Sequence, residues 1–142
     1  MRWAGMGDEA GLLEGETEEG AKPEYIVMDS MGIHLGVKDL SAILHFQNLV
    51  NRLGVDASEM GTGIGLLMEL WQRGIITGAD TGGMSYRWGD VDAIEITVQQ
   101  TARRQGFGQV LSDGTVAAAG KIGRDAIKYV CHSKGMTEVE DV

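Results

Sequence analysis

The segment NRLGVDASEMG, residues 51–61, leaves the chain almost no room to turn between two stretches that both read as amphipathic helices. Gly54 stands where the first helix needs a left-handed residue to end. Asp56 follows two residues later, where its carboxylate can accept from the free N–H groups of the next helix, and Glu59 is placed to reach back in a capping box. The segment therefore predicts two helices joined by a tight corner and no flexible loop.

Apolar residues recur at helical spacing in four stretches of the chain. These are 39–53, 56–74, 91–105 and, split and rich in alanine, 108–123. Asp39 and Asp90 are expected to cap the first and third of them. In the segment AIKYVCHSKGM, residues 126–136, apolar and polar residues alternate from 127 to 132, which indicates a short strand or an extended strap. The predicted fold class is all-α, a multihelical domain with short links and a short extended segment near the C-terminus.

Length and charge limit the domain count and the class of partner. A chain of 142 residues with 43% hydrophobic content can bury one ordinary core. We expect residues 1–22, which are rich in acids and glycine, to form an acidic flexible lead-in, and residues 23–142 to form the helical domain. The net charge of −9 repels phosphate backbones and anionic lipids, so neither nucleic acid nor membrane is an expected partner. Without a spanning apolar run or a secretory signal, the expected location is cytoplasmic.

Three glycines interrupt the second predicted helix at positions 61, 63 and 65. Each costs roughly 1 kcal/mol relative to alanine in a helix interior, so something must be gained there. Close packing against another helix is one explanation. Close approach of the backbone to a large ligand is the other, and the sequence leaves both open.

Residues that could carry chemistry are few. Cys131 is the single cysteine and cannot by itself form an internal disulfide or hold zinc or an iron–sulfur cluster, so no metal ligands are assigned. Of the three histidines, His45 reads as a partly buried structural residue and His34 as a surface residue. His132 stands in the extended segment, where it could relay a proton if a pocket forms there, although its spacing alone favours a structural role.

Five segments in order resemble the tungsten-dependent aldehyde:ferredoxin oxidoreductase family. They are PEY (23–25), MGIHLGVKDLSAI, NRLGVDASEMGTGIGLLMELWQRGIIT, RWGDVDAIEITVQQTARRQGFGQVLSDG and YVCHSKG. The resemblance runs from about Pro23 to Met136. It implies a helical region that packs against a separate β-rich domain, the two enclosing tungsten held by two pterin dithiolenes of the molybdopterin type.

The same resemblance implies roles for particular residues. The family's pterin-binding D-x-x-G-L-D loop matches NRLGVD, so Asn51, Gly54, Val55 and Asp56 are the candidate cofactor-binding residues. Asp56 would accept from pterin N–H groups, Gly54 would clear the ring edge, and Val55 would offer backbone contacts. His132, in HSKG, matches a histidine that lies near the metal and assists proton transfer, and it is the candidate catalytic residue.

The chain also departs from the family pattern. The cysteine motif of the 4Fe–4S cluster, which precedes PEY in the family, is absent, and Ile26 stands where many aldehyde oxidoreductases carry a glutamate near the metal. The expectation is a helical, pterin-contacting segment of a tungsten-pterin, iron–sulfur oxidoreductase that acts on aldehyde or oxo groups and is inactive alone. Its expected partners are the missing pterin-binding domain, the remaining helical part, a ferredoxin-type electron carrier and, through exposed apolar surface, further copies of itself. The alternative is a non-catalytic helical accessory module derived from that family.

Overall fold

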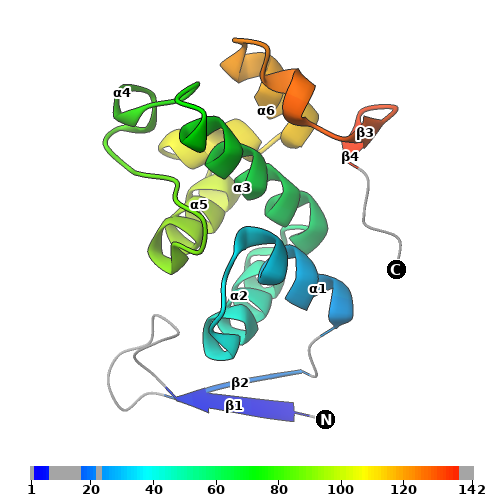
Figure 1. Cartoon of the computed structure of the whole chain (residues 1–142). Helices are drawn as coiled ribbons and strands as arrows, with labels where there is room; N and C mark the ends of the chain where they lie inside the picture. Colours follow the sequence, from blue (N-terminus) through cyan, green and yellow to red (C-terminus); the bar gives the residue numbers. More distant parts are fainter. Residues whose placement is uncertain (1, 7–16, 22–23, 138–142) are drawn as a thin grey trace.

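The computed structural model describes residues 2–6, 17–21 and 24–137 of the chain. The helices are joined by short links around one central helix (Figure 1). They are α1 (Tyr25–Ser30), α2 (Leu40–Leu53), α3 (Ala57–Gln72), α4 (Gly78–Thr81), α5 (Val91–Arg103) and α6 (Thr115–Ile122), with the 3₁₀ helices η2 (Ile33–Leu35), η3 (Phe107–Leu111) and η4 (Ala126–Tyr129). The predicted all-α, multihelical class is confirmed.

Two small antiparallel strand pairs accompany the helices. Strands β3 (His132–Ser133) and β4 (Met136–Thr137) form the short extended segment that the sequence predicts near the C-terminus. Strands β1 (Arg2–Met6) and β2 (Thr17–Ala21) pair beside α2 (Figure 1). They fall in the expected flexible lead-in, where the sequence pattern predicts no strand. Residues 1, 7–16 and 22 of that lead-in lie outside the described residues, and the domain boundary after residue 22 stays a prediction.

Helix α3 lies at the centre of the core. It contacts α1, η2, α5, α6 and η4, while α2 packs against α1 and α5. Because neighbours cover most of its surface, α3 is apolar on most of its circumference. The largest fully buried side chains are Tyr86, Phe46, Met31, Leu35, Ile64, Leu67, Met68, Leu70, Ile76, Ile94, Val50 and Val98. No helix within the described ranges is long and apolar enough to cross a membrane.

The predicted helix ends are confirmed for α2 and for the starts of α3 and α5. Asp39, Asp56 and Asp90 each cap the following helix by accepting from backbone N–H groups of its first turn. Gly54 ends α2 in the left-handed conformation, with φ of 67°. These ends form where expected because each depends only on residues within one turn of the boundary.

Other local expectations need correction. Helix α5 ends at Arg103, short of the predicted end at residue 105, because Arg104 takes the left-handed conformation, with φ of 52°. The polar segment 77–83 contains the one-turn helix α4, and the segment expected to be extended from residue 127 begins with the 3₁₀ helix η4. Packing against the core stabilises η4, since Ala126 is fully buried.

The glycines inside α3 are explained by close packing. A Cβ at Gly61 would lie 2.2 Å from the carbonyl oxygen of Ser30 in α1, and one at Gly63 would lie 2.9 Å from Leu111 of η3. A Cβ at Gly65 would lie 2.8 Å from the imidazole of His34 in η2. Each glycine lets a different element approach the helix backbone. The space beside these glycines is therefore filled by neighbouring protein segments and not by a ligand.

Candidate functional site

The corner between α2 and α3 lies at the surface. Asn51, Gly54 and Asp56 are exposed, and Val55 is half-buried against the edge of the core. No described atom lies within 4 Å of the position that a Cβ would take at Gly54. The main chain of residues 54–56 is therefore open to a partner on one side, and the tight turn presents it there.

The Asp56 carboxylate has one bond to a described residue, which leaves part of it available. Its Oδ1 accepts from the Glu59 backbone N–H at 2.8 Å, and among the described residues no donor is bound to Oδ2. Capping α3 therefore uses one oxygen and leaves the second to face solvent. The two roles assigned to Asp56, cap and ligand contact, can coexist on different oxygens.

The Glu59 side chain does not complete the predicted capping box. It turns away from Asp56 and accepts from the Thr115 backbone N–H at 2.6 Å and from the Thr137 hydroxyl. Helix α6 begins after Gly114, which offers no capping side chain, so a carboxylate from α3 satisfies its first N–H group. The prediction was wrong because two distant partners compete successfully for this carboxylate.

The pKa of Glu59 is lowered from its ordinary value. Burial acts in the opposite direction, but hydrogen bonds from the Thr115 backbone, the Thr137 hydroxyl and the Thr115 hydroxyl favour the carboxylate and outweigh it. Glu59 is therefore a charged residue that joins α3, α6 and β4.

His132 lies on β3, directly opposite Thr137 on β4, and is exposed. Because Thr137 donates to Glu59 in the first turn of α3, the β3–β4 hairpin is attached to the same helix end as the Asp56 corner. The structure thus brings all five predicted site residues to one end of α3. Sequence reasoning missed Glu59 as the link between them, because its partners lie 56 and 78 residues further along the chain.

The other histidines have structural surroundings. His45 is buried on α2, with its Nε2 3.4 Å from the Glu95 carboxylate of α5. His34 is exposed on η2 and covers Gly65. Across the described part of the chain, no group of three or more His, Cys, Asp and Glu side chains is arranged to hold a metal ion.

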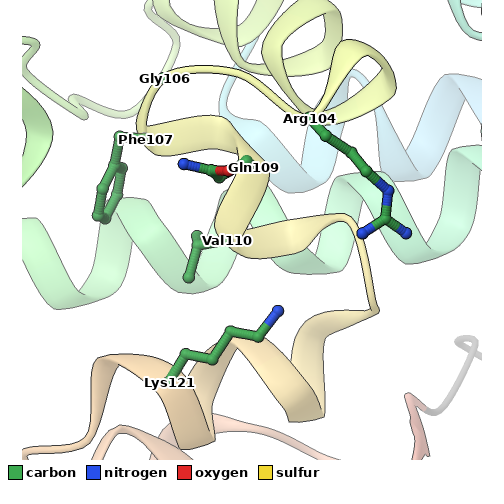
Figure 2. A pocket seen from close by; sticks show the side chains of 6 residues that line it. All are labelled: Arg104, Gly106, Phe107, Gln109, Val110 and Lys121. Carbon is green, nitrogen blue, oxygen red and sulfur yellow. The ribbon is translucent and has the colours of Figure 1, made fainter.

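Two surface hollows lie elsewhere, around η3 and α6. The larger has a volume of about 410 Å³ and is lined by Arg104, Gly106, Phe107, Gln109, Val110 and Lys121. Figure 2 shows Lys121 extending from α6 toward η3, with Phe107 and Arg104 to either side of η3. Arg104 and Lys121 both pair with Asp113, at 2.9 and 2.6 Å, so these cations are already neutralised in part. None of the predicted site residues lines either hollow.

Comparison with known proteins gives a match over almost the whole chain. Residues 7–140 match the family model described as aldehyde ferredoxin oxidoreductase, domains 2 and 3. A relative from Pyrococcus furiosus, named aliphatic sulfonate oxidoreductase, WOR-like subunit, is 36% identical over 118 residues, which are 80% of this chain and 19% of that protein. The tungsten-containing aldehyde ferredoxin oxidoreductase of Pyrococcus horikoshii is 33% identical over 110 residues, covering 75% of this chain and 18% of that protein.

A further tungsten-containing aldehyde ferredoxin oxidoreductase, from Pyrococcus furiosus, is 32% identical over 110 residues, covering 77% of this chain and 18% of that protein. The chain therefore spans about a fifth of the length of the curated relatives it matches. The family model covers residues 7–140, which is most of the chain. The chain belongs to the aldehyde ferredoxin oxidoreductase family.

Proposed function

We propose that this chain is a pterin-contacting helical segment of a tungsten-pterin, iron–sulfur oxidoreductase that acts on an aldehyde or oxo group. The observation that carries the proposal is the exposed corner at Gly54–Asp56, which stands at the same end of α3 as the hairpin that bears His132. Relatives that match this chain are named as tungsten-containing aldehyde ferredoxin oxidoreductases, which supports the choice of cofactor.

The residues at the corner suit a flat ring with N–H groups at its edge. No described residue fills the space where a Cβ would stand at Gly54, so a ring edge fits there, and Oδ2 of Asp56, to which no described residue donates, can accept from a ring N–H. Asn51 is exposed one helical turn before the corner and offers an amide donor and acceptor. Val55 packs its half-buried side chain against the core, so its main chain would make the contact with the ring.

The chain's own residues would bind and orient the ring, and one of them would transfer a proton. When bound, the tungsten–pterin group supplies two-electron oxidation or reduction at a carbonyl carbon. Asp56 and the main chain of 54–55 would fix the ring, and the exposed imidazole of His132 would hold or release a proton at the substrate oxygen. A 4Fe–4S cluster, whose cysteine motif is absent from this chain, would supply electron transfer to a ferredoxin-type carrier.

The isolated chain is proposed to be inactive and to need partners. A second protein face must grip the pterin from the other side, because the exposed residues Asn51, Gly54 and Asp56 can contact only one side of the ring. The expected partners are a separate pterin-binding domain and the remaining helical part of the enzyme. The proposed location is cytoplasmic.

A paired substitution tests the cofactor contact. Asp56 and Asp90 both cap a helix through one carboxylate oxygen, so Asp56→Ala and Asp90→Ala should each cost about 1 kcal/mol of stability. In enzyme assembled with its family partner segments, only Asp56→Ala should lower the bound tungsten and pterin, measured by elemental analysis and pterin fluorescence. Equal cofactor content in the two variants would contradict the role of Asp56, and stoichiometric cofactor on the isolated chain would contradict the need for partners.

One observation favours the alternative of a non-catalytic accessory module. Ile26, at the position where many family members carry a glutamate, presents an apolar side chain at the surface of α1. If the alternative holds, Ile26→Glu and His132→Ala will leave the turnover of the assembled complex unchanged while partner binding persists. A loss of turnover in His132→Ala with intact binding supports the catalytic proposal.

A further inference from the structure

The β3–β4 hairpin is too small to hold its own conformation. Each strand has two residues, and residues 131–136 are all exposed. A two-stranded hairpin of this size gains little from its own hydrogen bonds and buries no apolar face. A defined position for His132 therefore needs an anchor from outside the hairpin.

Glu59 provides that anchor. Its Oε1 accepts from the Thr115 backbone N–H at 2.6 Å, and its Oε2 accepts from the Thr137 hydroxyl. The Thr115 hydroxyl also donates to the Glu59 carbonyl, at 3.4 Å. With α6 on one oxygen and β4 on the other, the carboxylate has little freedom to rotate, and both bonds are of the stronger, charge-assisted kind.

We propose that Glu59 is a positioning residue, which holds β4 through Thr137 and so fixes His132, on the facing strand, at the end of α3 that carries the Gly54–Asp56 corner. The role of His132 rests on the proposed function above. The holding of the hairpin is a property of this chain and can be measured without cofactor.

Cys131 provides a direct probe because it is the chain's single cysteine, is exposed and precedes His132. A nitroxide attached to its thiol reports hairpin mobility by electron paramagnetic resonance, and amide hydrogen exchange over residues 132–137 reports opening. Thr137→Val keeps the shape and removes the hydroxyl donor, so it should mobilise the nitroxide and raise exchange by roughly tenfold or more. Thr137→Ser restores the donor and should behave as wild type.

Variants of Glu59 complete the test. Glu59→Ala should loosen the hairpin as Thr137→Val does, whereas Glu59→Gln should retain most of the order, because its oxygen can accept from Thr115 and its amide can donate to Thr137. Glu69→Gln, on the same helix but paired with Arg73, is the matched control and should change nothing in the hairpin. The proposal fails if Thr137→Val leaves mobility and exchange at the wild-type level, or if Glu69→Gln has the same effect.

The assembled enzyme separates this inference from the proposed function. If Thr137→Val loosens the hairpin and lowers turnover, while Thr137→Ser restores both, positioning of His132 is supported. A loosened hairpin with unchanged turnover would refute the catalytic role of His132 and with it the positioning role. An ordered hairpin in Thr137→Val would refute the anchor whatever the turnover.

Discussion

Replacing the α3 glycines by alanine should give effects that differ in size and are set by what each new methyl group meets. Gly61→Ala is the most severe case, because its Cβ would lie 2.2 Å from the Ser30 carbonyl oxygen and 2.7 Å from the Ser30 carbonyl carbon. These are backbone atoms, so no side-chain rotation can relieve the overlap. Helix α1 must move away from α3, and the contacts between these two helices must loosen.

The magnitude follows from two opposing contributions. Alanine gains about 1 kcal/mol over glycine as a helix residue, and overpacking against a rigid neighbour costs about 1–3 kcal/mol. With a backbone overlap this deep, the upper figure applies and the net loss for Gly61→Ala is about 2 kcal/mol. At Gly65 the new methyl meets the His34 imidazole, an exposed side chain that can rotate away, so the two contributions should nearly cancel.

Gly120→Ala is the matched control. Gly120 lies in helix α6, is exposed, and has no atom of another described residue within 4 Å of an added Cβ, so alanine should stabilise the chain by about 1 kcal/mol. Urea unfolding followed by circular dichroism measures all three variants. We expect Gly120→Ala to be the most stable variant, Gly65→Ala to be about as stable as wild type, and Gly61→Ala to be the least stable. If Gly61→Ala were as stable as Gly120→Ala, the close approach of α1 to α3 would be refuted.

Three further predictions concern charge, burial and association. The Arg124 side chain and the Thr77 N–H keep the pKa of Asp80 well below its ordinary value, so the folded chain binds fewer protons than the unfolded chain below about pH 4. Asp80→Asn should therefore lose less thermal stability than wild type when the pH falls from 5 to 3, and equal losses would contradict this. Burial raises the pKa of Tyr86 to about 12, so the contribution of its neutral hydroxyl to folding stability is present below about pH 10 and lost toward pH 12. Thermal melts of Tyr86→Phe should show a smaller loss of stability over that pH range. The side chain of Ile33 is 70% exposed, and we expect Ile33→Lys to reduce concentration-dependent self-association in sedimentation velocity, with a wild-type chain that stays monomeric as the opposing result.

Much of the fold could be predicted because its signals are local. Asp39, Gly54, Asp56 and Asp90 each act within one helical turn, and all four have the predicted place in the structure. Helix α1 escaped prediction because it is six residues long and has no side-chain cap; packing of Val27 against the core stabilises it instead. A pattern read along the chain does not contain that contact.

The candidate site was predictable only in part. The corner at Gly54–Asp56 could be located from helix stop and start signals, and the family resemblance added His132. The connection between the corner and His132 could not be predicted, because Glu59 accepts hydrogen bonds from Thr115 and Thr137 and not from the nearby Asp56 N–H. A D-x-x-E pattern favours the local partner, and only the folded arrangement of α6 and β4 supplies better ones.

The sequence separation between Glu59 and its two hydrogen-bond donors also determines when this site can form during synthesis. A ribosome releases the chain from its N-terminus, so α2 and α3 emerge well before residues 115 and 137, which supply the two donors. Until those residues leave the exit tunnel, the carboxylate stays hydrated and the end of α3 remains open. The corner and its histidine can therefore come together only when translation of this region is nearly complete.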